Sequence, residues 1–190
     1  MLTLLAFHGS GRDDTDLIAF AQYVAPSCPI VAPLGDFADG DGYTFFRRRP
    51  DRSIPVAQVV TEARQWLSRN APLLPPLGER IVLVGYSSGA IFAEAMLSVC
   101  PDRWAGAILL RPEPLAEEFI FPPMVGKPIL ILAGRHDTRR RTGDAARLAG
   151  QFDTAGAGVT LHILDTGHGW ADGNQDAVLA RAWLGDVGIG

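Results

Sequence analysis

The sequence predicts an α/β fold in which about six mostly parallel strands are flanked by helices on both faces. Short, nearly continuous apolar runs recur along the chain, and segments with helical spacing of apolar residues lie between them. Continuous runs indicate strands buried on both faces, and their alternation with helices indicates a parallel sheet. Because no repeat or linker divides the chain, we expect one domain over residues 1–190.

Six apolar runs predict the strands in chain order. They are Leu2–Phe7, Pro29–Ala32, Ile81–Val84, Ala107–Leu110, Ile129–Ala133 and Val159–Leu164. Apolar residues spaced three and four apart predict the helices that connect these strands. The helical faces are Leu17, Phe20, Ala21 and Val24; Val56, Val59, Val60, Ala63, Trp66 and Leu67; Ile91, Phe92, Ala95, Met96 and Val99; a segment over Thr142–Phe152; and Val178, Leu179, Ala182 and Trp183.

Two connections, Gly35–Pro55 and Arg111–Lys127, are longer than ordinary loops. Both leave carboxyl ends of predicted strands, where α/β sheets form their ligand crevice. We therefore expect aromatic side chains to line a substrate pocket there, although packing of the loops onto the domain explains them equally well. The pocket candidates are Phe45 and Phe46 in the first connection, Phe121 in the second, and Trp170, which follows the last predicted strand. A homodimer interface is a further explanation for Phe121 and Trp170.

Composition excludes several classes of function. A formal net charge of −4 without a basic block argues against nucleic-acid binding, which needs clustered cations. The two cysteines, Cys28 and Cys100, form neither a disulfide framework nor a metal-binding spacing, so we expect a cytoplasmic protein. No apolar stretch approaches the roughly 20 residues that span a bilayer, and Leu2–Phe7 predicts a buried strand rather than a leader. The clusters Arg47–Arg49 and Arg139–Arg141 suggest either an anion site or, more simply, solvated arginines.

The segment Gly85-Tyr86-Ser87-Ser88-Gly89 lies between a predicted strand and a predicted helix. This G-x-S-x-G pattern in that context is typical of a nucleophilic serine on a sharp turn, with glycines that allow the strand and helix to cross closely. The turn places the Ser88 amide and the helix N-terminus beside any negative charge that develops at Ser87. We therefore interpret Ser87 as the nucleophile of a hydrolase.

A serine nucleophile needs an imidazole base and a carboxylate that orients the imidazole. His168 lies between two glycines just after the last predicted strand, and we interpret it as the base. Asp137 follows the strand before it and is the favoured acid, with Asp165 and Asp172 as competitors. The chain order serine, aspartate, histidine is that of α/β-hydrolases.

The oxyanion hole needs a second backbone donor besides the Ser88 amide. The segment His8-Gly9-Ser10-Gly11 directly follows the first predicted strand, and its glycines let the backbone approach a ligand closely. We assign the Ser10 amide as the second donor. His8 is expected to brace this loop through hydrogen bonds.

The chain resembles the small bacterial carboxylesterases of the phospholipase/carboxylesterase family, which are relatives of the acyl-protein thioesterases. The matching segments are Phe7–Gly11 with Asp14–Leu17, Gly42–Arg48, Val82–Gly89, Ala107–Pro112, Gly134–Asp137 and Gly167–Gly169. The resemblance implies a compact α/β-hydrolase fold without a large lid, the Ser87–Asp137–His168 triad and hydrolysis of carboxylic esters, in some members of thioesters or lysophospholipids. The association of similar proteins with quinone-type compounds makes aromatic esters a candidate substrate class.

The chain departs from that family at two places. Ser88 stands where relatives often carry asparagine or glutamine, and Thr138–Arg141 replaces a common valine-proline turn after the acid. We expect a serine esterase that acts on a small-molecule ester, with no metal or organic cofactor. The alternatives are a thioesterase or lysophospholipase with the same triad, and a non-catalytic binding protein. Dienelactone hydrolases share the fold but carry cysteine at the elbow, so Ser87 argues against that group.

Overall fold

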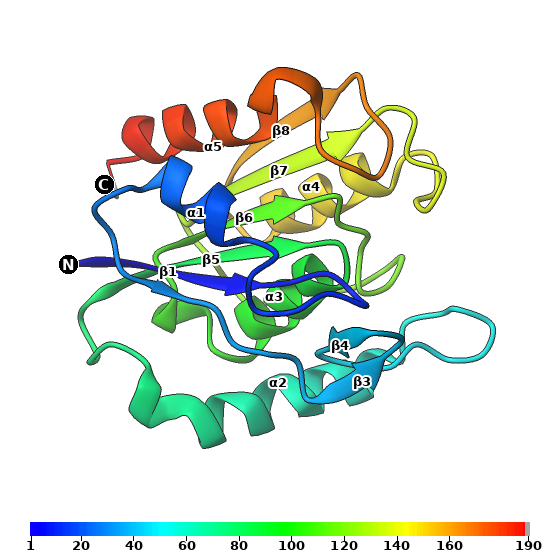
Figure 1. Cartoon of the computed structure of the whole chain (residues 1–190), viewed down its shortest axis with the longest axis horizontal. Coiled ribbons are helices and arrows are strands. Elements are labelled where there is room, and N and C mark those ends of the chain that lie inside the picture. The colour runs from blue at the N-terminus through cyan, green and yellow to red at the C-terminus, as the bar shows by residue number, and fades with distance from the viewer. Residues whose placement is uncertain (189–190) are drawn as a thin grey trace.

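A computed structural model describes residues 1–188 and contains a six-stranded sheet in which every pairing is parallel (Figure 1). The strand order is β2-β1-β5-β6-β7-β8. The strands are β1 (Leu2–Phe7), β2 (Ile30–Val31), β5 (Arg80–Tyr86), β6 (Gly106–Leu110), β7 (Pro128–Gly134) and β8 (Gly158–Leu164). The predicted α/β class and its parallel sheet are confirmed.

Helices cover both faces of the sheet. Helices α1 (Ile18–Val24) and α5 (Gln175–Asp186) pack on one face, and α2 (Val56–Asn70), α3 (Ser88–Val99) and α4 (Asp144–Thr154) pack on the other (Figure 1). Three short 3₁₀ turns complete the order, at Ala71–Leu73, Pro101–Arg103 and Asp172–Asn174. Strands β1 and β6 are buried throughout, and β5 is buried except at Arg80, because each lies between two helical layers.

The sheet reverses its winding between β1 and β5. From β1 the chain moves outward to β2, and it then returns to the other side of β1 and continues outward through β8. Strands β1 and β5 are paired in register, with Phe7 opposite Gly85. Ligands of open α/β sheets bind at the carboxyl ends of strands at such a reversal. The segments after Phe7 and Tyr86 therefore meet where a ligand is expected.

The structure differs from the sequence prediction at the edges of the sheet. The run Pro29–Ala32 forms only the two-residue strand β2, and β8 is half-exposed because it is the other edge strand. The loop Gly35–Pro55 contains a hairpin that was not predicted, formed by β3 (Phe37–Asp39) and β4 (Gly42–Thr44). This hairpin stands beside the carboxyl ends of the central strands (Figure 1).

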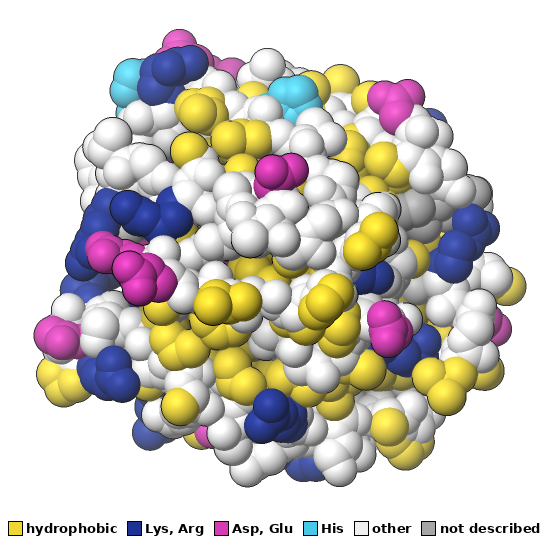
Figure 2. Space-filling model, turned by 180° about the vertical axis from the view of Figure 1, so that it is seen from behind, with side chains coloured by type: hydrophobic (Ala, Val, Ile, Leu, Met, Phe, Trp, Pro, Cys, Tyr) yellow, Lys and Arg dark blue, Asp and Glu magenta, His cyan; other side chains and the backbone are white. Residues whose placement is uncertain are grey.

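No helix within residues 1–188 combines the length and apolar character needed to cross a bilayer. On the side opposite to that of Figure 1, hydrophobic side chains are mixed with charged and polar ones (Figure 2). The homodimer suggested by the sequence stays a prediction.

Candidate active site

Ser87 occupies a strained turn between β5 and α3. Its backbone has φ 55° and ψ −111°, a left-handed conformation that residues other than glycine seldom adopt. The flanking glycines permit it: a Cβ atom on Gly85 would lie 2.5 Å from the Gly89 carbonyl oxygen, and one on Gly89 would lie 2.0 Å from the Phe7 carbonyl oxygen. The sequence folds this way because only hydrogen atoms fit at these two positions. The turn directs the Ser87 hydroxyl away from the sheet toward the loops.

The structure brings Ser87, His168 and Asp137 together from three loops. Ser87 Oγ lies 2.8 Å from His168 Nε2, and His168 Nδ1 lies 2.7 Å from Asp137 Oδ2. An ionised carboxylate only accepts hydrogen bonds, so Nδ1–H donates to Asp137 and Nε2 is left to accept the Ser87 O–H. Asp165, the competing acid, instead lies 2.8 Å from the exposed His136 ring.

The surroundings of His168 favour its neutral form. Burial lowers the pKa of its imidazole below the ordinary value of 6.5; the hydrogen bond to Asp137 opposes this shift, and the positive charge of Arg140 reinforces it. The side chain is 11% exposed. The ring is therefore available as a proton acceptor at neutral pH.

Two buried residues that the sequence did not reveal hold the loop of His168. Arg111 donates through Nε and Nη2 to the Gly169 carbonyl oxygen, at 3.1 and 2.8 Å, and it forms two hydrogen bonds with Asp176. The Tyr86 hydroxyl donates to the His168 carbonyl oxygen at 2.8 Å. The available signal was a charged residue directly after the apolar run of β6, but one sequence does not show its partner.

The loop after β1 and the start of α3 carry the two backbone amides that the sequence suggested as donors of an oxyanion hole. The amides of Ser10 and Ser88 have no hydrogen-bond acceptor among residues 1–188, and both residues line the same cleft. His8 braces this loop: its Nε2 accepts a hydrogen bond from the Gly35 amide at 2.9 Å, and Nδ1 donates to the Gly9 carbonyl oxygen at 2.8 Å. Two backbone amides in the cleft that contains Ser87 are therefore free, in the described part of the chain, to donate to a ligand.

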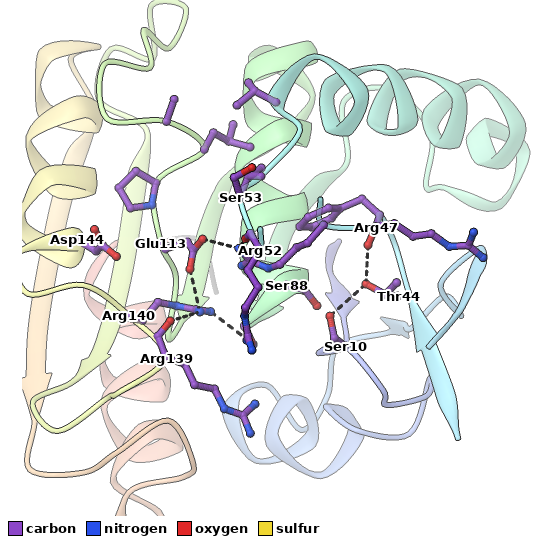
Figure 3. Close-up of a pocket in the computed structure, with 18 of the residues that line it drawn as sticks. Ser10, Thr44, Arg47, Arg52, Ser53, Ser88, Glu113, Arg139, Arg140 and Asp144 are labelled. Carbon is purple, nitrogen blue, oxygen red and sulfur yellow. Dashed lines mark hydrogen bonds and ion pairs between the residues drawn. The ribbon is translucent and has the colours of Figure 1, made fainter. Parts of the chain in front are cut away.

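A cleft of about 900 Å³ opens at Ser87 (Figure 3). Glu113, Arg139 and Arg140 lie on one side of it, and Ser10, Thr44 and Arg47 lie on the other. Its walls come from the hairpin loop after β2 and the long loop after β6, the two segments that the sequence singled out, and also from the loop after β7 and the start of α4. No cluster of three or more His, Cys, Asp or Glu side chains suited to a metal ion occurs within the described part of the chain.

Three of the four aromatic residues expected in the pocket lie elsewhere, and that expectation is corrected. Phe46 lines the cleft. Phe45 is 1% exposed and stacks on Phe92 in the core, because its loop turns the ring inward. Phe121 stacks on Phe152 of α4, where it ties its own loop to the domain. Trp170 is 43% exposed and stacks on Tyr86 outside the cleft.

Arg140 is the least expected residue of the site. Its side chain is 10% exposed, and its Nη2 lies 3.2 Å from Ser87 Oγ. Glu113 joins it to Arg48 through contacts of 3.0 and 2.8 Å. The simpler interpretation of the arginine clusters, solvated surface charge, is therefore wrong for these two arginines. Burial lowers the pKa of Arg140, and the Glu113 carboxylate opposes that shift.

Comparisons with known proteins place this geometry among hydrolases. The model of the Dienelactone hydrolase family matches residues 56–184. The chain is 26% identical over 183 residues to "Putative hydrolase MhqD" of Bacillus subtilis (strain 168), covering 95% of this chain and 90% of that protein.

Solved structures of two carboxylesterases are also similar to this chain. The carboxylesterase from Mesorhizobium loti is 27% identical, with a TM-score of 0.86 over 96% of this chain and 88% of its own. The Bacillus cereus carboxylesterase is 24% identical, with a TM-score of 0.87 over 97% of this chain and 88% of its own, a likeness of fold.

Proposed function

The chain belongs to the dienelactone hydrolase family and is a hydrolase with the α/β-hydrolase fold, and from this premise we propose that it is a serine carboxylesterase of small esters. The sequence-based exclusion of a dienelactone hydrolase relationship, drawn from the serine at position 87, is wrong at the level of the family. The family includes this chain although its elbow carries serine. The oxygen nucleophile nevertheless defines the chemistry that we propose.

One observation carries the proposal: Ser87 Oγ lies 2.8 Å from the imidazole Nε2 of His168, which Asp137 orients from the other side. In the proposed reaction, His168 takes the Ser87 proton as Oγ bonds to the ester carbonyl carbon. The carbon–oxygen bond to the alcohol then breaks, and His168 donates the proton to the leaving oxygen. Water adds to the acyl-enzyme by the same route and releases the carboxylic acid.

Backbone amides supply the proposed stabilisation of the transition state. The carbonyl oxygen becomes negative in the tetrahedral intermediate, and the proposed donors to it are the amides of Ser10 and Ser88, two residues that line the cleft. The N-terminus of α3 begins at Ser88, so its dipole favours negative charge at the same point. Loss of one such donor typically costs about 10²–10³ in turnover.

The substrate is proposed to be a small ester, aromatic esters among them. The cleft of about 900 Å³ admits a small molecule, and Phe46, although only 2% exposed, lines it. A thioesterase or lysophospholipase would use the same three side chains and differ in its leaving group. Direct comparison of p-nitrophenyl acetate with a long acyl-thioester separates these activities.

Labelling with a fluorophosphonate tests the proposal. The wild type should acquire one adduct at Ser87 and hydrolyse p-nitrophenyl acetate. Ser87→Ala should lose both reactions. Ser98→Ala is a matched control in α3 and should keep both, because the Ser98 hydroxyl bonds only the Ala95 carbonyl oxygen. A wild-type protein that is folded, unlabelled and inactive on the ester panel contradicts the proposal and favours a binding protein.

A further inference from the structure

The cleft beside Ser87 has an excess of positive charge. Seven arginines but five carboxylates line it. Arg141 and Arg147 each contact a carboxylate of their own, Glu117 and Asp144 respectively. In contrast, Arg48 and Arg140 share the single carboxylate of Glu113. This group of three side chains therefore carries one net positive charge beside the proposed nucleophile.

The guanidinium of Arg140 retains a free donor. Its Nε–H is shared between the carbonyl oxygens of Arg111 and Pro112, and its Nη1 donates to Glu113 and to the Arg139 carbonyl oxygen. Nη2 carries two hydrogens, and Ser87 Oγ is its one acceptor in the described structure. A largely buried cation with an unused N–H favours an additional anionic acceptor from a ligand.

A second polar group at the cleft also lacks a partner. Ser88 is 3% exposed, and its Oγ has no hydrogen-bond partner among residues 1–188. Its residue lines the cleft together with Arg140 and Arg48. Buried hydroxyl groups are normally hydrogen-bonded, so this hydroxyl is a second group at the cleft that a polar ligand could satisfy.

We propose that the cleft selects esters whose short acyl chain ends in a carboxylate, with Arg140 and Arg48 binding that carboxylate. This inference rests on the esterase activity proposed above. In its reaction a monoester of a dicarboxylic acid and water give the free dicarboxylate and an alcohol. Ser87 Oγ first replaces the alcohol at the carbonyl carbon, and water then replaces Oγ.

The charge belongs on the acyl side of the ester for a geometric reason. The leaving oxygen must approach His168 Nε2 to receive its proton, and His168 is not part of the cleft wall. Arg140 is part of that wall, and its Nη2 donates to Ser87 Oγ at 3.2 Å. The acyl group stays bonded to Oγ, so a carboxylate two or three carbons from the ester carbonyl remains within reach of the guanidinium.

A matched pair of substrates tests this inference. Monoethyl succinate carries the terminal carboxylate, and ethyl succinamate replaces it with a neutral amide of nearly the same shape. At pH 7 and low salt, the wild-type kcat/KM, followed by release of ethanol, should be about 10- to 100-fold higher for the anion, as expected for hydrogen bonds to a charged group. The preference should shrink in high salt, because ions screen a partly exposed pair.

Two variants test which arginine causes the preference for the anionic ester. In Arg140→Gln the ratio of the two kcat/KM values should approach one, and a loss of activity common to both esters leaves this ratio unchanged. Arg141→Gln removes an equal charge from the same region but affects an 81% exposed side chain, so it should keep the wild-type ratio. If Arg140→Gln does not fold, Arg48→Gln should lower the ratio instead. Equal effects of Arg140→Gln and Arg141→Gln would contradict the assignment of the carboxylate to Arg140.

The failure of this inference is distinguishable from failure of the esterase proposal. Equal hydrolysis of the two esters that depends on Ser87 overturns the inference and leaves the esterase standing. If neither ester is hydrolysed, calorimetric titration of the Ser87→Ala protein decides. Binding of monoethyl succinate, but not of ethyl succinamate, that is lost on adding Arg140→Gln supports the anion site. Binding of neither compound, or of both equally, overturns it, whatever the result of fluorophosphonate labelling.

Discussion

Arg111 and Asp176 form a two-point ion pair, with contacts of 2.8 and 2.9 Å, beside the loop that carries His168. Both side chains are 1% exposed. The pair also ties both ends of a short loop segment: Arg111 donates to the Gly169 carbonyl oxygen, and Asp176 Oδ2 accepts from the Ala171 amide at 2.8 Å. A buried pair of this kind fixes geometry more reliably than it adds net stability.

Removal of one partner from this pair should therefore strongly destabilise the folded protein. Asp176→Ala leaves the Arg111 cation buried without its carboxylate, and we expect a loss of about 3–5 kcal/mol in the free energy of unfolding. Urea denaturation measures this loss. Where the variant still folds, kcat should fall because the loop of His168 has lost its anchor. Asp186→Asn, in the exposed last turn of the same helix, should change neither quantity appreciably.

The activity should persist to unusually low pH for a histidine base. Only neutral imidazole accepts the Ser87 proton, and the pKa of His168 is lowered by burial, so kcat/KM should rise with pH through an inflection below 6.5. Ester hydrolysis measured from pH 4 to 8 tests this expectation. An inflection above 6.5, or a flat profile over the whole range, would count against His168 as the base.

Arg140 contributes to that pKa through its charge, after the larger effect of burial. In Arg140→Gln the inflection should move to higher pH, because the imidazolium no longer faces the guanidinium. A loss of activity without any movement of the inflection would indicate that Arg140 acts only through packing.

The sequence predicted the elements whose physical signal is local. Strands β1, β5, β6 and β7 are buried on both faces, so continuous apolar runs mark them clearly. The edge strand β2 forms only two residues, and the sequence pattern places the hairpin β3–β4 in a loop, although its turn, Gly40-Asp41, is a recognisable turn signal.

In the candidate site, too, the sequence predicted residues that have a local signal and missed those that depend on distant contacts. The glycine spacing around Ser87 and the positions of Asp137 and His168 after strand ends were visible, and the structure places these three side chains within hydrogen-bond distance. Their catalytic roles remain a proposal. The contacts of Arg140 and Arg111 were not visible, since they join residues distant in sequence. The burial of Phe45 and Phe121 likewise depends on how two long loops fold back onto the domain.

The glycine at position 89 should be far less replaceable than other helical glycines. In Gly89→Ala the new Cβ would lie 2.0 Å from the Phe7 carbonyl oxygen, so α3 must move away from β1. We expect a loss of about 3 kcal/mol or more in stability, together with loss of activity, because the Ser87 turn opens. Gly150→Ala in α4 meets nothing within 4 Å and should instead stabilise the protein by about 0.5–1 kcal/mol. Thermal and urea unfolding of the two variants make the comparison.

Glu94 of α3 should make stability fall as the pH rises. It is fully buried, its Oε2 accepts from the Leu115 amide at 3.2 Å, and its Oε1 has no partner among the described residues. Burial raises the pKa of its carboxyl well above 4.5, so above pH 4.5 the folded state holds a proton that the unfolded state releases. The folded state is therefore disfavoured progressively between pH 4.5 and its own pKa, by up to about 1.4 kcal/mol per pH unit.

Glu94→Gln removes this titration while keeping the shape of the side chain. The variant and the wild type should have similar stabilities near pH 4.5, and the variant should gain relative to the wild type as the pH is raised toward 8. Urea denaturation at four or five pH values measures the difference, with Glu62→Gln on helix α2, an intermediate-exposure site, as a control that should show no comparable trend. A stability difference that is constant with pH would contradict this prediction. It would mean that Glu94 ionises in the folded protein as readily as in the unfolded chain, with a bound water or ion as the partner of Oε1.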